Sequence, residues 1–170
     1  MPELVATYRA FEALATEILG QGQTLRFQAK GACMRPFVRD GDVVEVEPIG
    51  ESSIRRGDVV LFREAEDRVL VHRVIQLGPR DRPDGLLTKG DAVVHPDEPV
   101  VRDRVLGRVV AVERGARRVR LDSRASRLLG LVCGARRPLV WRLGGCARAL
   151  VGWLHRQGCS RARGTDVRVA

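Results

Sequence analysis

The sequence predicts a mainly β domain with a coiled, barrel-like sheet, preceded by one N-terminal helix and followed by an amphipathic helical extension. Short segments of strand-like alternation follow one another, separated by turn signals such as Arg56-Gly-Asp58 and the polar loop at residues 78–85. Helical periodicity, in contrast, is confined to the two ends of the chain. Short strands at this density are typical of barrel-like folds, and 170 residues with 44% hydrophobic content indicate one domain with an appendage.

The first element expected is a helix over residues 3–19, which ends at the glycines of residues 20–22. Its apolar positions recur at helical spacing. These positions are Leu4, Tyr8, Phe11, Leu14, Ala15 and Ile18. The period then changes to two over residues 24–30, which predicts a strand leading to Cys33.

Further strands and a second helical region follow. The strands are expected at residues 42–48, 58–63, 69–77, 86–88, 105–113 and 117–121. Helical periodicity returns over 124–133 and 137–156, and Pro138 and Gly144-Gly145 interrupt it. The expected organisation is an N-terminal helix (1–23), a β domain (24–122), basic amphipathic helices (123–157) and a disordered tail (158–170).

The positive charge belongs to the C-terminal third of the chain. The net charge is +9, and from Glu113 onward 14 arginines face only three acidic residues. Such a segment suits anionic lipid or nucleic acid, or serves as a solubilising tail. We favour peripheral contact of residues 124–157 with an anionic membrane, with Trp141 and Trp153 as interfacial anchors, over helices packed on the β domain. Nucleic acid is a less favoured partner.

No run approaches 18 uncharged apolar residues, and no signal peptide opens the chain. We therefore expect no transmembrane helix and a cytoplasmic location. Peripheral contact with the inner face of the membrane is compatible with that location.

Cys33 lies in the turn-like stretch Gly31-Ala-Cys-Met-Arg-Pro36. Gly31 permits close backbone approach and Pro36 fixes the exit direction, so a single thiol is presented on a tight turn. The other cysteines follow in the Arg-rich region, and no Cys or His spacing indicates a metal site, so we expect no metal or cofactor. An isolated thiol fits a reducing compartment. The alternative is a small, buried, inert cysteine.

Three further residues are candidates for chemistry. His72 alternates with Leu70 and Val74, and we expect desolvation on this face to hold the imidazole neutral and able to accept a proton. Asp91 or Asp97 then suits a carboxylate that orients the imidazole. A satisfied core histidine and simple turn aspartates are the alternatives, and Gly-Asp pairs also recur at 41–42 and 57–58.

Taken in order, the short motifs resemble the signal peptidase I and LexA-like peptidase family over roughly residues 24–112. The blocks are Gly31-x-Cys-Met-x-Pro36, Arg56-Gly-Asp-Val-Val-Leu-Phe62, Val71-His-Arg-Val-Ile75, Thr88-Lys-Gly-Asp91 with Asp97, and Gly107-Arg-Val-Val110. The resemblance implies the coiled β-sheet fold of that family. It places Cys33 where the family has its serine nucleophile. His72 falls where the bacterial branch has its lysine base, as in the archaeal and endoplasmic-reticulum signal peptidases.

The resemblance also implies the surroundings of the nucleophile. Asp91 and Asp97 match aspartates that the archaeal and endoplasmic-reticulum branch uses. With His72 as the general base, Asp97 is expected to orient it, and Asp91 to support the site or act as a second carboxylate. Gly31, Cys33 and Met34 match the substrate-binding and oxyanion segment, in which the backbone N–H of the nucleophile is a donor. Some members add a hydroxyl two residues earlier, which Gly31 lacks, and one such donor is worth on the order of 3 kcal/mol.

The function expected is an endopeptidase that cleaves a protein or peptide precursor, bound as an extended strand, by a Cys-His(-Asp) mechanism. One alternative is a catalytically degenerate peptidase fold that acts as a peptide-binding or regulatory module. LexA-like self-cleavage is less favoured, because residues 20–24 contain no Ala-Gly or similar pair of small residues as a scissile site.

Overall fold

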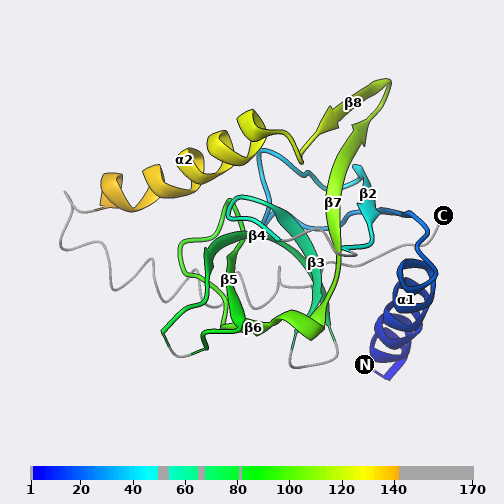
Figure 1. Ribbon diagram of the computed structural model, residues 1–170. Helices are drawn as coiled ribbons and strands as arrows, with labels where there is room; N and C mark the ends of the chain where they lie inside the picture. Colours follow the sequence, from blue (N-terminus) through cyan, green and yellow to red (C-terminus); the bar gives the residue numbers. More distant parts are fainter. Residues whose placement is uncertain (1, 50–53, 65–67, 81, 142–170) are drawn as a thin grey trace.

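The computed structural model describes residues 2–49, 54–64, 68–80 and 82–141, and for 2–7 and 133–141 it describes the backbone path only. The expected tail at 158–170 and the second half of the expected helical extension lie outside the described residues. The sheet occupies the middle of the chain, as expected, with the two helices α1 and α2 at its ends (Figure 1).

Within the described residues, eight strands follow one another between α1 and α2. In chain order they are α1 (Pro2–Gly20), β1 (Leu25–Gln28), β2 (Val43–Glu47), β3 (Val59–Arg63), β4 (Val69–Leu77), β5 (Gly85–Lys89), β6 (Val100–Val101), the 3₁₀ turn η1 (Arg102–Arg104), β7 (Val105–Arg114), β8 (Arg117–Arg120) and α2 (Arg124–Trp141). The mainly β expectation is confirmed. Strand β6 is not among the expected strands, because two residues are too short to show alternation.

All strand pairs are antiparallel, and the order β1-β2-β7-β3-β4-β5-β6 places β1 and β6 at the two edges. The central strand β7 pairs with β2 along one edge and with β3 and then β8 along the other. Register shifts at Glu45/Val46, Leu61/Phe62 and Val74/Gln76 mark bulges, which bend strands. The sheet is accordingly curled, as Figure 1 shows.

Two buried apolar clusters lie on the two faces that strand alternation creates. In β2, Val44 and Val46 are fully buried while Glu45 and Glu47 point outward, as a half-buried strand requires. The larger cluster also includes Phe11, Ala15 and Leu19 of α1, and Phe11 packs edge-on against Phe27 of β1 with ring centroids 5.1 Å apart. The smaller one joins Val60 and Phe62 to Leu70 and Val74.

Helix α2 differs from the sequence expectation at one point. Residues 124–133 and 137–156 were expected as separate helices with a break near Pro138, but the chain is helical from Arg124 to Trp141. A proline within a helix removes one backbone hydrogen bond and usually kinks the axis, and neither effect must end the helix. The expected interruption at Pro138 is therefore wrong.

Gly107 of β7 provides a test of how α1 packs on the sheet. A Cβ at this position would lie 2.5 Å from Val46 Cγ1 and 3.1 Å from Leu19 Cδ1. We expect Gly107→Ala to lower the free energy of unfolding by about 1–3 kcal/mol, the usual cost of overpacking. Gly20→Ala, which has nothing within 4 Å, is the control. Equal urea midpoints for the two variants would contradict this packing.

Candidate active site

Cys33 lies in the connection between β1 and β2. One hydrogen bond within this connection and one to the segment after β5 hold it in place. Gly31 N–H donates to Asp40 Oδ1 at 2.8 Å, with Gly31 at a φ of 102° that favours glycine. The carbonyl of Cys33 accepts from Ala92 N–H at 2.7 Å. The Cys33 side chain is half-buried against the larger cluster, so the thiol is both held and reachable.

Gly90 brings the end of β5 into direct contact with Cys33. A Cβ at Gly90 would lie 2.8 Å from the Cys33 carbonyl oxygen and 3.2 Å from Cys33 Cβ. These distances are shorter than van der Waals contact, so a side chain at Gly90 would push Cys33 away. The Lys89-Gly90-Asp91 segment therefore sets the position of the thiol.

His72 of β4 is buried and bonded to Asp97. Its Nδ1 lies 2.7 Å from Asp97 Oδ2, and the hydroxyl of Thr88 in β5 donates to the same carboxylate oxygen at 2.7 Å. The backbone N–H of Asp97 donates to the Thr88 carbonyl at 2.9 Å, which ties the aspartate to β5. Because Nδ1 faces Asp97, Nε2 is the ring nitrogen left for another partner.

That other partner is the thiol of Cys33, which is hydrogen-bonded to His72. Burial by itself lowers the pKa of His72, but the hydrogen bonds with Asp97 and Cys33 and the charges of these two groups outweigh burial and raise the pKa from 6.5 to about 10. The expectation of a neutral imidazole is thus wrong. Desolvation acts as expected, but two acidic neighbours exceed it, and His72 is an imidazolium at neutral pH.

The structure brings Cys33, His72 and Asp97 together and places Asp91 differently. Asp91 accepts two hydrogen bonds from Arg73, from Nε at 2.8 Å and Nη2 at 2.7 Å, and both side chains are almost fully buried. Its carboxylate is directed at Arg73. Met34 is buried in the larger cluster, and its carbonyl accepts from Phe37 and Val38, so this residue shapes the turn.

Three residues of this arrangement are not among the candidates expected from the sequence: Thr88, Gly90 and Arg73. Thr88 is fully buried, and a buried hydroxyl needs a partner, so its place on an apolar strand was an available signal. Arg73, also fully buried, gave the same signal through its position next to His72 in a run of aliphatic residues. Nothing in the sequence separates Gly90 from an ordinary turn glycine.

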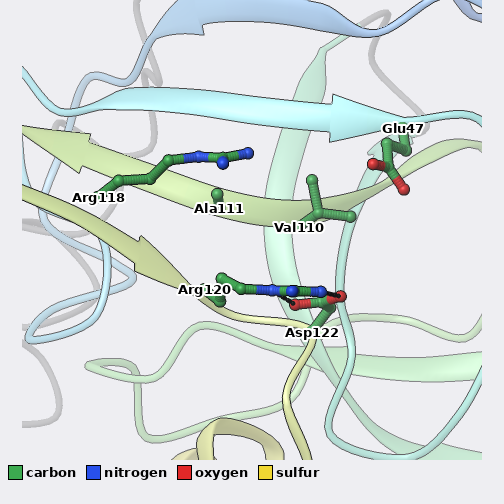
Figure 2. A pocket seen from close by; sticks show the side chains of 6 residues that line it. All are labelled: Glu47, Val110, Ala111, Arg118, Arg120 and Asp122. Atoms are coloured by element: carbon green, nitrogen blue, oxygen red, sulfur yellow. Dashed lines mark hydrogen bonds and ion pairs between the residues drawn. The ribbon is translucent and has the colours of Figure 1, made fainter.

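A pocket of about 260 Å³ lies elsewhere, on the side of the sheet formed by β2, β7 and β8 (Figure 2). It is lined by Glu47, Val110, Ala111, Arg118, Arg120 and Asp122. Its arginines are already paired, Arg120 with Asp122 and Arg118 with Glu45. None of the candidate site residues lines it. Across the described residues, no group of three or more His, Cys, Asp or Glu side chains is arranged to hold a metal.

The raised pKa of His72 gives stability a defined pH dependence. The charged pairing with Asp97 stabilises the fold fully below pH 6.5, and this contribution is lost as the pH rises through about 10. We expect Asp97→Asn to cost about 1.5–3 kcal/mol at about pH 6 and clearly less at about pH 10. Urea unfolding at both pH values measures it, with the exposed Asp84→Asn as control. A cost that stays constant or grows with pH would contradict the charge assignment.

The chain matches no protein-family model, no curated protein and no solved structure. What supports a function is therefore the bonded set Cys33, His72, Asp97 and Thr88, together with the order of motifs in the sequence.

Proposed function

We propose that this protein is a cysteine endopeptidase that cleaves a peptide bond in a protein or peptide precursor. One observation carries the proposal, the continuous chain of hydrogen bonds from Cys33 through His72 to Asp97. A nucleophile, a proton carrier and an orienting carboxylate in series are the parts that acyl transfer by a thiol requires. Thr88, which donates to the same Asp97 oxygen, holds the carboxylate in place.

The charge state of His72 sets the order of proton transfers. In the resting site the thiolate of Cys33 is paired with the imidazolium, so the nucleophile needs no deprotonation. Its sulfur attacks the carbonyl carbon of the substrate, and the C–N bond breaks as Nε2–H of His72 donates its proton to the leaving amine. The products of this step are a thioester on Cys33 and a neutral His72.

Hydrolysis of the thioester completes the cycle. Neutral His72 removes a proton from a water molecule, which attacks the thioester carbonyl and releases the carboxylic acid product as the C–S bond breaks. Thiolate and imidazolium are thereby restored. As the family resemblance implies, the backbone N–H of Cys33 stabilises the oxyanion in both steps. The hydrogen bond from Ala92 to the Cys33 carbonyl fixes the loop that carries this donor.

The alternative function is a peptide-binding module without catalysis. In this alternative, Cys33, His72 and Asp97 would have a structural role only. The incomplete burial of Cys33 argues against it, because a purely structural cysteine is normally buried. The fully buried Thr88 and the buried His72 share one carboxylate oxygen, an arrangement that orients the imidazole toward the thiol.

Alkylation of Cys33 by iodoacetamide tests the thiolate directly. In a background with Cys133, Cys146 and Cys159 replaced by serine, we expect fast alkylation of Cys33 at about pH 6, where an ordinary thiol is only about one part in 300 ionised. His72→Ala should lower this rate on the order of a hundredfold, because it leaves an ordinary thiol. A rate indifferent to His72 would refute the ion pair.

Peptide cleavage separates the two functions. The parent protein and Cys33→Ala are incubated with a library of extended peptides that carry small side chains, and products are identified by mass spectrometry. The enzyme proposal requires cleavage that Cys33→Ala abolishes. Binding of the same peptides by both proteins, without any product, would establish the binding module in its place.

A second proposal concerns the outer side of α2, where we infer contact with an anionic membrane. Leu128, Leu129 and Val132 are 66%, 56% and 42% exposed, although all are apolar. The sequence that follows α2 contains six arginines and one aspartate, a charge balance complementary to anionic lipid. Over its described residues, neither helix is long and apolar enough to cross a bilayer.

Co-sedimentation with vesicles tests this surface. We expect binding to vesicles that contain phosphatidylserine and little binding to phosphatidylcholine alone. The double variant Leu128→Ser/Leu129→Ser should weaken binding on the order of tenfold, because two leucines no longer enter the interface. Leu77→Ser, at a 39% exposed leucine of β4, is the control. If the double variant binds as the parent does, α2 is not the contact surface.

A further inference from the structure

Arg73 of β4 is almost fully buried, at 1% exposure, and it is the largest of the fully buried side chains among the described residues. Its guanidinium contacts segments from four parts of the chain. Nε and Nη2 bind the carboxylate of Asp91 after β5, and Nη1 donates to the carbonyl of Gly57 before β3 at 2.8 Å. A buried arginine with this many partners is fixed in one orientation.

The other two contacts involve the Cys33 loop and α2. The guanidinium carbon lies 4.8 Å from the ring centroid of Phe37, a cation–π distance, and Phe37 is four residues beyond Cys33. From the other side α2 approaches so closely that a Cβ at Gly130 would lie 2.2 Å from the same carbon. An ion pair of Arg127 with the buried Asp58 anchors α2 beside this contact.

Arg73 and two of its partners, Asp91 and Phe37, lie close in the chain to residues of the candidate site. Arg73 follows His72 directly, so the strand that holds the guanidinium also holds the imidazole. Asp91 follows Gly90, whose backbone touches Cys33. Phe37 and Cys33 share one loop. The guanidinium therefore ties together the backbone segments whose relative position sets the distance between the thiol and the imidazole.

We propose that Arg73 is a positioning residue that holds the Cys33 loop and the segment after β5 in register with His72, and that α2, through Gly130, keeps its guanidinium out of water. The inference rests on the proposed Cys33–His72 pair and adds a residue that does not touch the substrate. A lysine cannot replace Arg73, because an ammonium group cannot bind both Asp91 oxygens, the Gly57 carbonyl and the Phe37 ring at once.

The test is a double-mutant cycle on the alkylation rate of Cys33, in the full chain with the three other cysteines replaced by serine. We expect Arg73→Lys to lower the rate at about pH 6 by on the order of tenfold to a hundredfold, as misplacement of reacting groups does. In a His72→Ala background the same change should have little further effect, because no pair remains to be positioned. Arg118→Lys, which breaks a bidentate pair with Glu45 on the surface, is the control.

The outcomes separate the two proposals. A parent Cys33 without enhanced reactivity would refute the proposed function itself. A reactive parent with an unchanged Arg73→Lys, or a loss of equal size in both backgrounds, would reduce Arg73 to a structural role. If Arg73→Lys does not fold, Gly130→Ala is used in the same cycle. Its methyl group displaces the guanidinium or α2, so a rate equal to the parent's would overturn the proposal.

Discussion

The curl of the sheet is the constraint on which the candidate site depends. Cys33 follows β1 at one edge, while His72 lies in β4, four strand spacings away, which is about 19 Å in a flat sheet. The two side chains are nevertheless hydrogen-bonded. The curl of the sheet and the loop after β1 together cover this distance, and the bulges in β2–β7, β3–β7 and β4–β5 supply the bends. Because Gly90 has no side chain, the segment after β5 can lie in direct contact with Cys33.

The aspartates of the core and the candidate site fall into two groups by their partners. Asp42, Asp58 and Asp91 each pair with an arginine, which carries a permanent charge, and each follows a glycine. Asp42 and Asp58 also accept from the backbone N–H three residues earlier, so they close turns. Asp97 differs because its partners are a histidine and a threonine. A carboxylate with a titratable partner is the one suited to move a proton, whereas an arginine partner cannot release one.

Much of the fold follows from sequence because alternation and turn signals are local properties. The strands at 58–63, 69–77 and 105–113 are found within about two residues, the usual precision of such boundaries. Partners are not local. Residue type alone does not distinguish Asp91 from Asp97, and the resemblance alone separates their expected roles. In the fold, Asp97 meets His72 as expected, whereas Asp91 meets Arg73. The charge of His72 was mispredicted for the same reason, since its flanking aliphatics are visible in sequence and its acidic neighbours are not.

The charge of His72 and the identity of the nucleophile are consistent with each other. Cys33 itself contributes to the raised pKa of His72, through its hydrogen bond and its charge, beside the contribution of Asp97. A thiol can give up its proton beforehand and remain paired with the imidazolium. Within the proposed mechanism, Cys33 is thus matched to the electrostatics of its site.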